Sequence, residues 1–507
     1  MTTTKAESGT AQNDEAADAR DTFDSLNPAT DEVVGTHPVH TDADVAEAVA
    51  RARAAADWWV GLDFAGRAER LLRWRTLVTR RSAELAELVH AETGKPIPDA
   101  MLEIVLAIDH TAWAAKHARK VLGLQRRSAG LLMANQAATV EWLPLGVVGV
   151  IGPWNYPVFT PMGSIAYALA AGNAVVFKPS EYTPGVGQWL ADTFAEVVPE
   201  HPVLQAVTGF GATGAALCRS GVDKLAFTGS PATGKKIMAA CAETLTPVLI
   251  EAGGKDALLV DEDADVDAAA DAAVWGGMSN AGQTCVGVER VYVHERVYDQ
   301  FVGKVVEIAK TVHAGADAGD KIGPITMPGQ LPIIKRHIED ALARGGKALL
   351  GGTDAVGEKF VQPTVLVDVP EDSAAVREET FGPTLTIAKV ADMDEAVTLA
   401  NASRYGLAAT VFSRGRGKEL ARRLRSGMTA VNGVITFAGI PSLPFGGVGE
   451  SGFGRIHGPE GLKEFTRAKA VARQRFRPPL NLTTFARKPN TDAMVGRLIN
   501  LLHGRTR

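Results

Sequence analysis

Cysteine is scarce in this chain of 507 residues, which contains only Cys218, Cys241 and Cys285. Three cysteines cannot build a disulfide framework, and so few thiols fit a reducing compartment, which predicts a cytoplasmic protein. The 11 histidines form no H-E-x-x-H pattern, and no C-x-x-C-type metal pattern occurs. We therefore predict no catalytic metal.

An excess of positive charge is also missing, since the formal net charge is -5. The sequence therefore gives no general reason to bind nucleic acid. The N-terminus is polar and contains no apolar core segment, which excludes a secretory signal peptide. We expect residues 1–20 to form a disordered leader.

A continuous hydrophobic helix is absent too. Residues 145–177 contain no charged residue, and this stretch is longer than the roughly 20 residues that span a membrane. Glycines and prolines interrupt it, however, among them Gly149, Pro153 and Pro157, and they break a continuous helix. We interpret the segment as a buried strand, a turn, a helix and a second buried strand, and we predict no transmembrane span.

The sequence does contain an alternation of apolar runs and helical segments. The chain is long enough for two or three domains. Helical spacing of apolar residues predicts helices over 41–60, 67–93 and 98–121. Five short apolar runs follow, at 147–151, 174–177, 204–207, 225–227 and 248–250, with helices expected between them at 161–171, 185–198, 212–220 and 233–243. This βαβα order predicts a Rossmann-like parallel sheet of the dinucleotide-binding kind.

A second α/β block is expected from about residue 256 to residue 445. Its predicted strands are 290–293, 384–390, 407–412 and 429–432, and its predicted helices are 296–312, 328–344, 393–402 and 415–426. Segment 126–144 lacks strong helix signals and ends in Thr-Val-Glu-Trp, so it could form a strand pair.

Four motifs carry residues that suit catalysis or cofactor binding. Cys285 lies in Ser-Asn-Ala-Gly-Gln-Thr-Cys-Val-Gly, and Glu251 lies 34 positions earlier in Glu-Ala-Gly-Gly-Lys. Pro-Trp-Asn-Tyr-Pro at 153–157 and Glu-Glu-Thr-Phe-Gly-Pro at 378–383 complete the set. Taken in their order along the chain, the four motifs resemble those of the aldehyde dehydrogenase superfamily, of the NAD(P)-dependent, hydrolytic type. The resemblance extends from about Phe23 to about Ala472.

The resemblance implies an α/β fold with a Rossmann-like parallel-sheet cofactor domain, a second α/β catalytic domain and a small β oligomerisation arm. The implied ranges are 21–125 and 145–253 for the NAD-binding domain, 254–454 for the catalytic domain, and 126–144 with 455–475 for the arm. In the resembled family this arm pairs across subunits, so we expect a homodimer or a homotetramer.

The resemblance also implies a chemical role for three residues. An aldehyde can lose hydride once a nucleophile has added to it, and a cysteine suits that addition. Cys285 would be the nucleophile, Glu251 the general base for water, and the Asn155 amide with the Cys285 N–H would hold the oxyanion. The alternative for Glu251 is an ion pair with Lys255. Cys218 and Cys241 lie in apolar helical segments and are interpreted as buried small hydrophobes.

Two loops are candidates for the phosphates of NAD. Residues 209–214 match G-x-G-x-x-G but follow the third strand of the unit, so an ordinary strand-to-helix turn is favoured there, with Gly211 kept as a candidate. Gly229, Ser230 and Gly234 open a helix directly after a strand, where free N–H groups favour phosphate. The alternative is an ordinary N-capped helix.

Two further segments complete the predicted cofactor site. Lys178 and Glu181 follow a predicted strand, and a carboxylate there can accept both ribose hydroxyls and would repel a 2′-phosphate. Glu181 therefore favours NAD, with NADP left open, although a solvated surface pair is the alternative. By resemblance, Trp154, Glu379 and Phe381 also contact the cofactor, with Glu379 on the nicotinamide ribose and Phe381 beside the nicotinamide.

The residues expected around the aldehyde are mostly apolar. They are Tyr156, Phe159, Met278 and Phe437, with Trp275 and Ile440 near them. Met278 stands where some semialdehyde-specific relatives place an arginine, which favours an aliphatic or aromatic aldehyde. Glu251 favours release of a free acid, because relatives that acylate coenzyme A tend to lack this carboxylate. A semialdehyde-specific enzyme, an acylating enzyme and a non-catalytic protein on the same fold remain alternatives.

The C-terminal tail, 476–507, is basic and amphipathic. Between residues 473 and 507 there are eight basic residues and one acidic residue, Asp492. Apolar residues from Met494 to Leu502 have the spacing of one helix face. Docking on a partner subunit is the first interpretation. A gate over the substrate site and a weak contact with an anionic membrane surface are the others.

Overall fold

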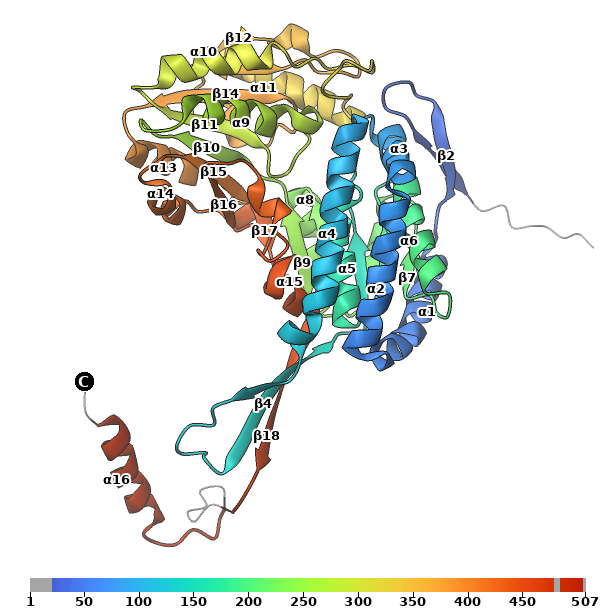
Figure 1. The fold of residues 1–507 in the computed structure, drawn as a ribbon, viewed down its shortest axis with the longest axis vertical. Coiled ribbons are helices and arrows are strands. Elements are labelled where there is room, and N and C mark those ends of the chain that lie inside the picture. The colour runs from blue at the N-terminus through green and yellow to red at the C-terminus, as the bar shows by residue number, and fades with distance from the viewer. Residues whose placement is uncertain (1–20, 478–483, 505–507) are drawn as a thin grey trace, which may run out of the picture.

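The structure is a computed structural model and describes residues 21–477 and 484–504. The predicted leader, residues 1–20, lies outside the described residues. Two α/β bodies lie side by side, and a narrow β arm projects from the N-terminal one (Figure 1). A helix lies beyond the arm, apart from both bodies (Figure 1). The chain therefore has the mixed α/β architecture that the sequence predicted.

The first body is built on a six-stranded sheet. Its strand order is β17 (Gly452–Phe453), β9 (Val248–Ala252), β8 (Lys224–Gly229), β5 (Val147–Ile151), β6 (Ala174–Lys178) and β7 (Leu204–Ala206). All pairs are parallel except β17 with β9. The five apolar runs in 147–250 are thus confirmed as strands. They are apolar throughout because helices cover both faces of a parallel sheet.

Helices surround this sheet as the periodicity predicted. They are α5 (Phe159–Ala171), α6 (Pro184–Val197), α7 (Gly211–Arg219) and α8 (Pro231–Ala242), together with α1 (Asp42–Gly61), α2 (Asp63–Arg80), α3 (Ser82–Thr93) and α4 (Ile97–Leu122). The uncharged segment 145–177 forms β5, a turn, α5 and β6. Among the described residues, no helix is long and apolar enough to cross a membrane.

The predicted helical segment 67–93 is interrupted at Arg81. There the backbone leaves the helical region (φ -106°, ψ 19°), and α2 and α3 run on either side of it. Both helices contact α4, and the Arg81 guanidinium binds Glu84 of α3 and Glu196 of α6. Apolar spacing continues through the break because both helices bury the same kind of face, so periodicity alone does not reveal it.

The second body contains a seven-stranded sheet. Its order is β12 (Lys347–Leu350), β13 (Thr364–Val367), β14 (Thr384–Val390), β11 (Val288–His294), β10 (Asp256–Val260), β15 (Ala408–Phe412) and β16 (Met428–Val431), and only β12 is antiparallel. The four predicted strands are confirmed as β11, β14, β15 and β16. Strands β10, β12 and β13 were not predicted.

Helices also accompany the second sheet. They are α9 (Val266–Met278), α10 (Tyr298–Ala309), α11 (Leu331–Ala343), α12 (Ala374–Arg377), α13 (Met393–Asn401) and α14 (Gly417–Arg423), with 3-10 turns at Ser279–Gly282, Pro328–Gln330, Thr353–Ala355, Thr436–Gly439 and Gly449–Ser451. The predicted helices 296–312, 328–344, 393–402 and 415–426 correspond to α10, the Pro328 turn with α11, α13 and α14.

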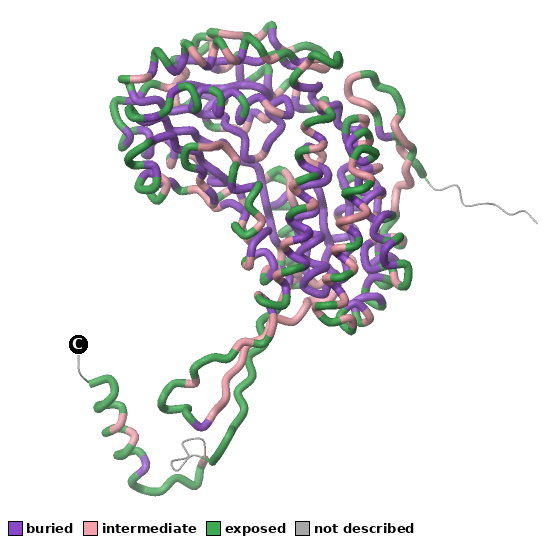
Figure 2. The backbone as a smooth tube through the Cα atoms, viewed as in Figure 1, coloured by how far each residue is buried: buried purple, intermediate pink, exposed green. Residues whose placement is uncertain are grey.

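The arm consists of β4 (Gln136–Pro144) between β3 (Gln125–Arg127) and β18 (Thr466–Gln474). Segment 126–144 is therefore in a strand pair, and its main partner comes from the other end of the chain, after α15 (Gly458–Glu464). Most of β18 is exposed (Figure 2). Strands β1 (Thr22–Leu26) and β2 (Val33–Pro38) form a separate hairpin.

The predicted tail helix is α16 (Thr491–His503). Its apolar face is open, with Met494 56% and Leu501 77% exposed. Since α16 lies beyond the arm and apart from both bodies (Figure 1), it does not cover a site within its own subunit in this arrangement.

A buried pair of histidines joins α4 to the loop before α15. The ring centroids of His110 and His457 are 3.9 Å apart, among the rings of Phe159 and Phe445. Burial lowers the pKa of His110 to about 4, and it lowers the pKa of His457 well below the usual range. Both imidazoles are therefore neutral at physiological pH.

This pair predicts a loss of stability in mild acid. Below the ordinary histidine pKa of about 6.5 the unfolded chain takes up protons that the folded chain refuses. The contribution of the pair to the free energy of unfolding should therefore fall by up to about 1.4 kcal/mol per pH unit per histidine, down to a pH of about 4 for His110. The buried carboxyls of Glu92 and Glu251, with pKa values raised to about 7, contribute in the opposite direction, so the effect of the pair is the difference between wild type and variant. Urea titrations between pH 7.5 and 5 measure the slope. His110→Phe should reduce the slope, and an unchanged slope would contradict the assignment.

Candidate active site

Cys285 and Glu251 come from different segments and meet in the structure. Glu251 lies near the end of β9 and is buried, whereas Cys285 follows the 3-10 turn at Ser279–Gly282 and keeps part of its surface exposed. The thiol and the carboxylate are close enough that each shifts the pKa of the other. The meeting of these two residues could not be established from the sequence.

The surroundings of Glu251 suit a base that works near neutral pH. Burial raises its pKa to about 7, while the nearby Thr228 and Cys285 side chains act to lower it. Neither carboxylate oxygen has a partner that meets hydrogen-bonding geometry in the described chain. Burial, followed by the charges of Glu251 and Glu379, raises the pKa of Cys285 well above its usual value. The thiol is thus protonated, with an acceptor carboxylate beside it.

The alternative interpretation of Glu251 is wrong, because Lys255 does not pair with it. The Lys255 ammonium pairs with Glu289 and donates to the Thr380 hydroxyl at 2.9 Å. Glu251 is therefore left without a counter-ion from its own motif.

Asn155 lies beside the cysteine segment and is held there by hydrogen bonds. Its Nδ2 donates to the Gln283 carbonyl at 2.8 Å, and the Tyr156 hydroxyl bonds to Thr284 Oγ1 at 3.0 Å. Asn280 reinforces this contact by donating to the Asn155 carbonyl at 3.0 Å. The loop after β5 and the loop before Cys285 therefore form one unit.

Gly282 explains part of the motif around Cys285. Its φ is +72°, and a Cβ built there would lie 2.1 Å from the backbone of Gly382. Only glycine allows this backbone-to-backbone approach of the cysteine loop and the 378–383 segment.

A buried ion pair that sequence reasoning missed supports Asn155. Lys95 Nζ lies 2.8 Å from Glu103, both side chains are 1% exposed, and the same ammonium donates to the Asn155 carbonyl at 2.6 Å. The other Glu103 oxygen accepts the N–H groups of Val158 and Phe159. Lys95 lies between the predicted helices 67–93 and 98–121, and nothing local indicated its partner.

Glu103→Gln should therefore weaken both folding and catalysis. The change leaves a buried ammonium unpaired, which should lower the free energy of unfolding by about 3 kcal/mol. It should also lower kcat by at least about tenfold, because the Asn155 loop loses its support. Urea unfolding and initial rates measure the two effects. Glu464→Gln, which breaks the half-buried pair with Lys224, is the matched control, and an equal loss of kcat there would refute the assignment.

The first sheet offers a site for a dinucleotide where its strand order reverses. From β5 the chain proceeds outward to β6 and β7, and then returns to β8 on the other side. The carboxyl ends of β5 and β8 therefore flank a crevice of the kind that binds dinucleotides. Trp154 and Asn155 follow β5, whereas Gly229 ends β8 and Ser230 follows it. Gly211 follows the edge strand β7 instead.

The donors and acceptors at this edge fit a dinucleotide. Ser230 caps α8 by accepting the Thr233 N–H at 3.3 Å, and Pro231 has no N–H, so the Ala232 N–H is the donor of the first turn that remains for phosphate. Gly234 lies within the same helix, packed over Ile250. Lys178 Nζ is 3.8 Å from Glu181, and Glu181 itself remains partly exposed. A partly exposed carboxylate and a lysine thus lie beside the N-terminus of α8 at this edge of the sheet.

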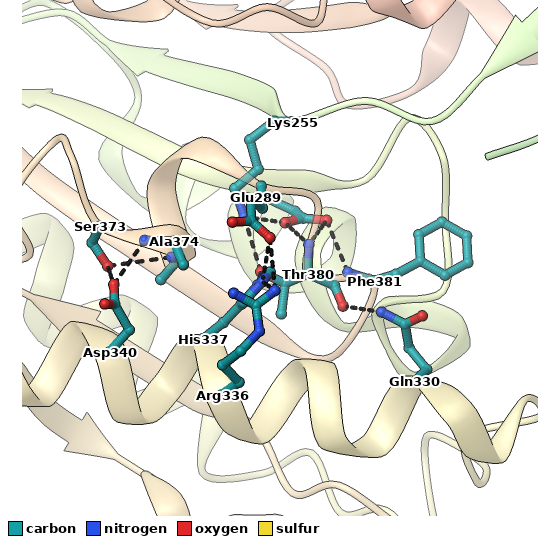
Figure 3. Close-up of polar contacts among 12 residues, drawn as sticks. Lys255, Glu289, Gln330, Arg336, His337, Asp340, Ser373, Ala374, Thr380 and Phe381 are labelled. Carbon is teal, nitrogen blue, oxygen red and sulfur yellow. Dashed lines mark hydrogen bonds and ion pairs between the residues drawn. The ribbon is translucent and has the colours of Figure 1, made fainter. Parts of the chain in front are cut away.

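Glu379 and Phe381 lie on the other side of the crevice. Glu379 accepts the Gly254 N–H at 3.0 Å, and the rings of Phe381 and Trp154 meet edge to face at 5.6 Å. Figure 3 shows the buried polar contacts that hold the loop, centred on Thr380. The loop of Trp154 and the loop of Glu379 and Phe381, which the sequence assigned to the cofactor, therefore contact each other.

The candidate substrate residues differ in exposure. Tyr156 is half-buried, while Phe159 and Phe437 are buried. Met278 is buried in the hydrophobic core of the second body. Trp275 and Ile440 are 44% and 43% exposed, so their apolar side chains are accessible to solvent. Cys218 and Cys241 are buried on α7 and α8, as predicted.

No group of three or more metal-ligating side chains occurs in the described ranges 21–477 and 484–504.

Known proteins resemble this chain over most of its length. The model of the aldehyde dehydrogenase family matches residues 15–471. A 4,4'-diapolycopene aldehyde oxidase from Methylomonas sp is 37% identical over 462 residues, 90% of this chain and 87% of that protein. A Mycobacterium ulcerans (strain Agy99) protein named "Putative succinate-semialdehyde dehydrogenase (NADP(+)) 2" is 38% identical over 477 residues, 92% of each chain.

Solved structures share the fold. An NAD-dependent aldehyde dehydrogenase from Sinorhizobium meliloti superposes with a TM-score of 0.87 at 35% identity, covering 92% of this chain and 93% of that one. An NADP dependent enzyme from E. coli superposes with a TM-score of 0.85 at 32% identity, covering 90% and 95%. Both nicotinamide cofactors thus occur among the proteins that this chain resembles.

Proposed function

This chain belongs to the aldehyde dehydrogenase family, and from that premise we propose that it oxidises an aldehyde to the free carboxylic acid with NAD and water. The observation that carries the proposal is the meeting of the Cys285 thiol with the buried carboxylate of Glu251, which Lys255 does not neutralise. A thiol nucleophile and a water-activating base are what oxidation followed by hydrolysis requires.

Cys285 begins the proposed reaction. Glu251 accepts the thiol proton, and the sulfur then adds to the carbonyl carbon of the aldehyde. The oxygen becomes negative, and the Asn155 amide with the Cys285 N–H stabilises it. A bound nicotinamide dinucleotide supplies the hydride acceptor for the oxidation, which leaves the acyl group on the Cys285 sulfur.

Glu251 completes the reaction. After the first step its proton must pass to solvent, so that the carboxylate can take a proton from water. The resulting hydroxide adds to the thioester carbon, and the carbon–sulfur bond breaks. The products are the carboxylic acid and the regenerated thiol. A pKa of about 7 lets Glu251 act in both proton transfers.

Residues on both sides of the crevice would hold the cofactor. The N-terminus of α8 and Lys178 suit the phosphates, Glu181 and Glu379 suit the two riboses, and Phe381 with Trp154 suits the nicotinamide side. We favour NAD, because a carboxylate at position 181 would repel a 2′-phosphate. NADP is the alternative, and relatives of both kinds keep it open.

We propose an aliphatic or aromatic aldehyde as the substrate. Tyr156, Trp275 and Ile440 supply apolar surface, and the Lys95 ammonium, 4.3 Å from the Tyr156 ring centroid, is already paired with Glu103. It is therefore not free to bind a second carboxylate. The relative named as a succinate-semialdehyde dehydrogenase makes a semialdehyde the main rival.

Absorbance of the reduced nicotinamide tests this function. The purified chain is given NAD or NADP with aldehydes of increasing chain length, benzaldehyde and succinate semialdehyde, each with and without coenzyme A. We expect reduction with NAD, without coenzyme A, and a free acid as product. Preference for succinate semialdehyde would replace the substrate proposal. Formation of an acyl-coenzyme A would replace the hydrolytic mechanism, and no reduction under any condition would leave a non-catalytic role.

We also propose a cytoplasmic homodimer or homotetramer, in which the arm pairs between subunits. The exposed β18 edge and the three free thiols support this proposal. The open apolar face of α16 suits docking on a second copy, and a weak contact with an anionic membrane surface is the alternative.

A further inference from the structure

The 378–383 segment carries Glu379 and Phe381 and is neither helix nor strand. It connects α12 to β14, and its conformation includes a positive φ of 52° at Phe381. A non-glycine residue in this region of the backbone needs support from its surroundings. The support comes from buried groups that the proposed mechanism does not use (Figure 3).

Glu289 provides most of this support. It is the second residue of β11, is 5% exposed, and lies four positions after Cys285. Its Oε2 accepts the Thr380 N–H at 2.8 Å, and its Oε1 accepts the Phe381 N–H at 3.1 Å. One carboxylate thus binds two successive amides of the loop, one on each oxygen.

Lys255 connects this carboxylate to the segment of Glu251. Its ammonium pairs with Glu289 and donates to the Thr380 hydroxyl at 2.9 Å. His337 Nδ1 lies 3.1 Å from the same hydroxyl, and Gln330 Nε2 donates to the Thr380 carbonyl at 2.8 Å. The loop is therefore held at the N–H, hydroxyl and carbonyl groups of a single residue.

From these contacts we infer that Glu289 is a positioning residue, which holds Glu379 and Phe381 in register with Cys285 for the nicotinamide end of the cofactor. The inference rests on the proposed function. Glu289 and Cys285 follow each other closely on one segment, and that segment packs backbone to backbone on the loop at Gly282 and Gly382. A displacement of the loop would therefore move the ribose-binding carboxylate relative to the thiol.

Glu289→Gln tests the inference, because glutamine keeps the shape and one acceptor oxygen but removes the charge. It replaces one amide acceptor with an NH₂ group and leaves the Lys255 ammonium unpaired. We expect the Kd for NAD, measured by calorimetry without aldehyde, to rise at least about tenfold, and kcat to fall by about 10²-fold. In the protein without cofactor, the amides of Thr380 and Phe381 should exchange hydrogen faster.

Lys347→Gln is the control on an exposed ion pair away from the loop. It removes the ion pair between Lys347 and Asp368, in which the two side chains are 70% and 56% exposed. This variant should leave the Kd for NAD and the amide exchange unchanged, because exposed pairs contribute little.

A second variant keeps the test decisive if Glu289→Gln fails to fold. Thr380→Val removes only the hydroxyl that Lys255 and His337 contact, and should raise the Kd for NAD about threefold with faster exchange of the loop amides. Unchanged NAD affinity and amide exchange in both folded variants, or in Thr380→Val alone if the other is unfolded, would overturn the inference. A wild-type chain that binds NAD but oxidises no aldehyde would overturn the proposed function, while the affinity and exchange measurements would still decide the role of Glu289.

Discussion

Replacing Cys285 with alanine is expected to lower kcat for aldehyde oxidation by at least about 10³-fold, because the carbonyl carbon then has no nucleophile. The cofactor residues lie on other segments, so the Kd for NAD should change by less than about threefold. Initial rates of nicotinamide reduction and calorimetric titration with NAD measure these two quantities. Loss of turnover with retained binding would assign the defect to the chemical step.

Cys218→Ala and Cys241→Ala are the matched controls. Both thiols are buried on helices that flank the first sheet, so each change removes a sulfur atom from the core without touching the site. Each control should lose some stability and keep most of its kcat. Reduction of NAD at more than about a tenth of the wild-type rate in Cys285→Ala would refute Cys285 as the nucleophile.

Glu251→Gln is expected to separate the two halves of the reaction. Without the carboxylate, water is not activated and the acyl group stays on Cys285, so steady-state kcat should fall by about 10²-fold to 10⁴-fold. If another group can take the thiol proton, rapid mixing will show a burst of one reduced nicotinamide per site. Mass spectrometry should then detect the acylated Cys285.

The pH dependence gives a second readout for Glu251. Its pKa is about 7 in the folded chain, so the wild-type rate of deacylation should rise as the pH increases through 7 and the carboxylate loses its proton. Glu251→Gln should lose this rise. A variant that keeps both the steady-state rate and the rise would show that another group is the base.

Glu92→Gln is the control for this experiment. Burial also raises the pKa of Glu92 to about 7, but this carboxylate caps α6 by accepting the N–H groups of Gly185 and Val186. The substitution should lower the free energy of unfolding and leave the pH profile of deacylation in place. Changes in stability and changes in chemistry are thereby distinguished.

Local patterns in the sequence were sufficient for much of the fold. The strands β5 to β9 are short apolar runs flanked by helical spacing, and burial on both faces makes such runs visible without a structure. The strands β10, β12 and β13 were missed. Strand β12 is partly exposed, and β10 follows directly after the Glu251 motif, so neither stood apart from its neighbours as an isolated apolar run.

In the candidate site, too, some residues could be predicted from the sequence and others could not. Cys285 stood out because a polar, glycine-containing neighbourhood does not suit a core cysteine, and Glu251 because of its motif. The partners of Lys95 and Lys255 had no local signal. An ion pair depends on which side chains the fold brings within a few ångströms, and Glu103 and Glu289 resemble many other carboxylates in the sequence.

The sequence by itself therefore determined the alternation of strands and helices, the nucleophile and base candidates, and the resemblance that ordered them. Periodicity and residue type over a few positions carry that information. Only the tertiary structure decided that Lys255 pairs with Glu289 and not with Glu251, that β18 closes the arm onto β4, and that Glu289 holds the loop of Glu379. These contacts join segments far apart in the chain, and their stability comes from burial and geometry that no local pattern records.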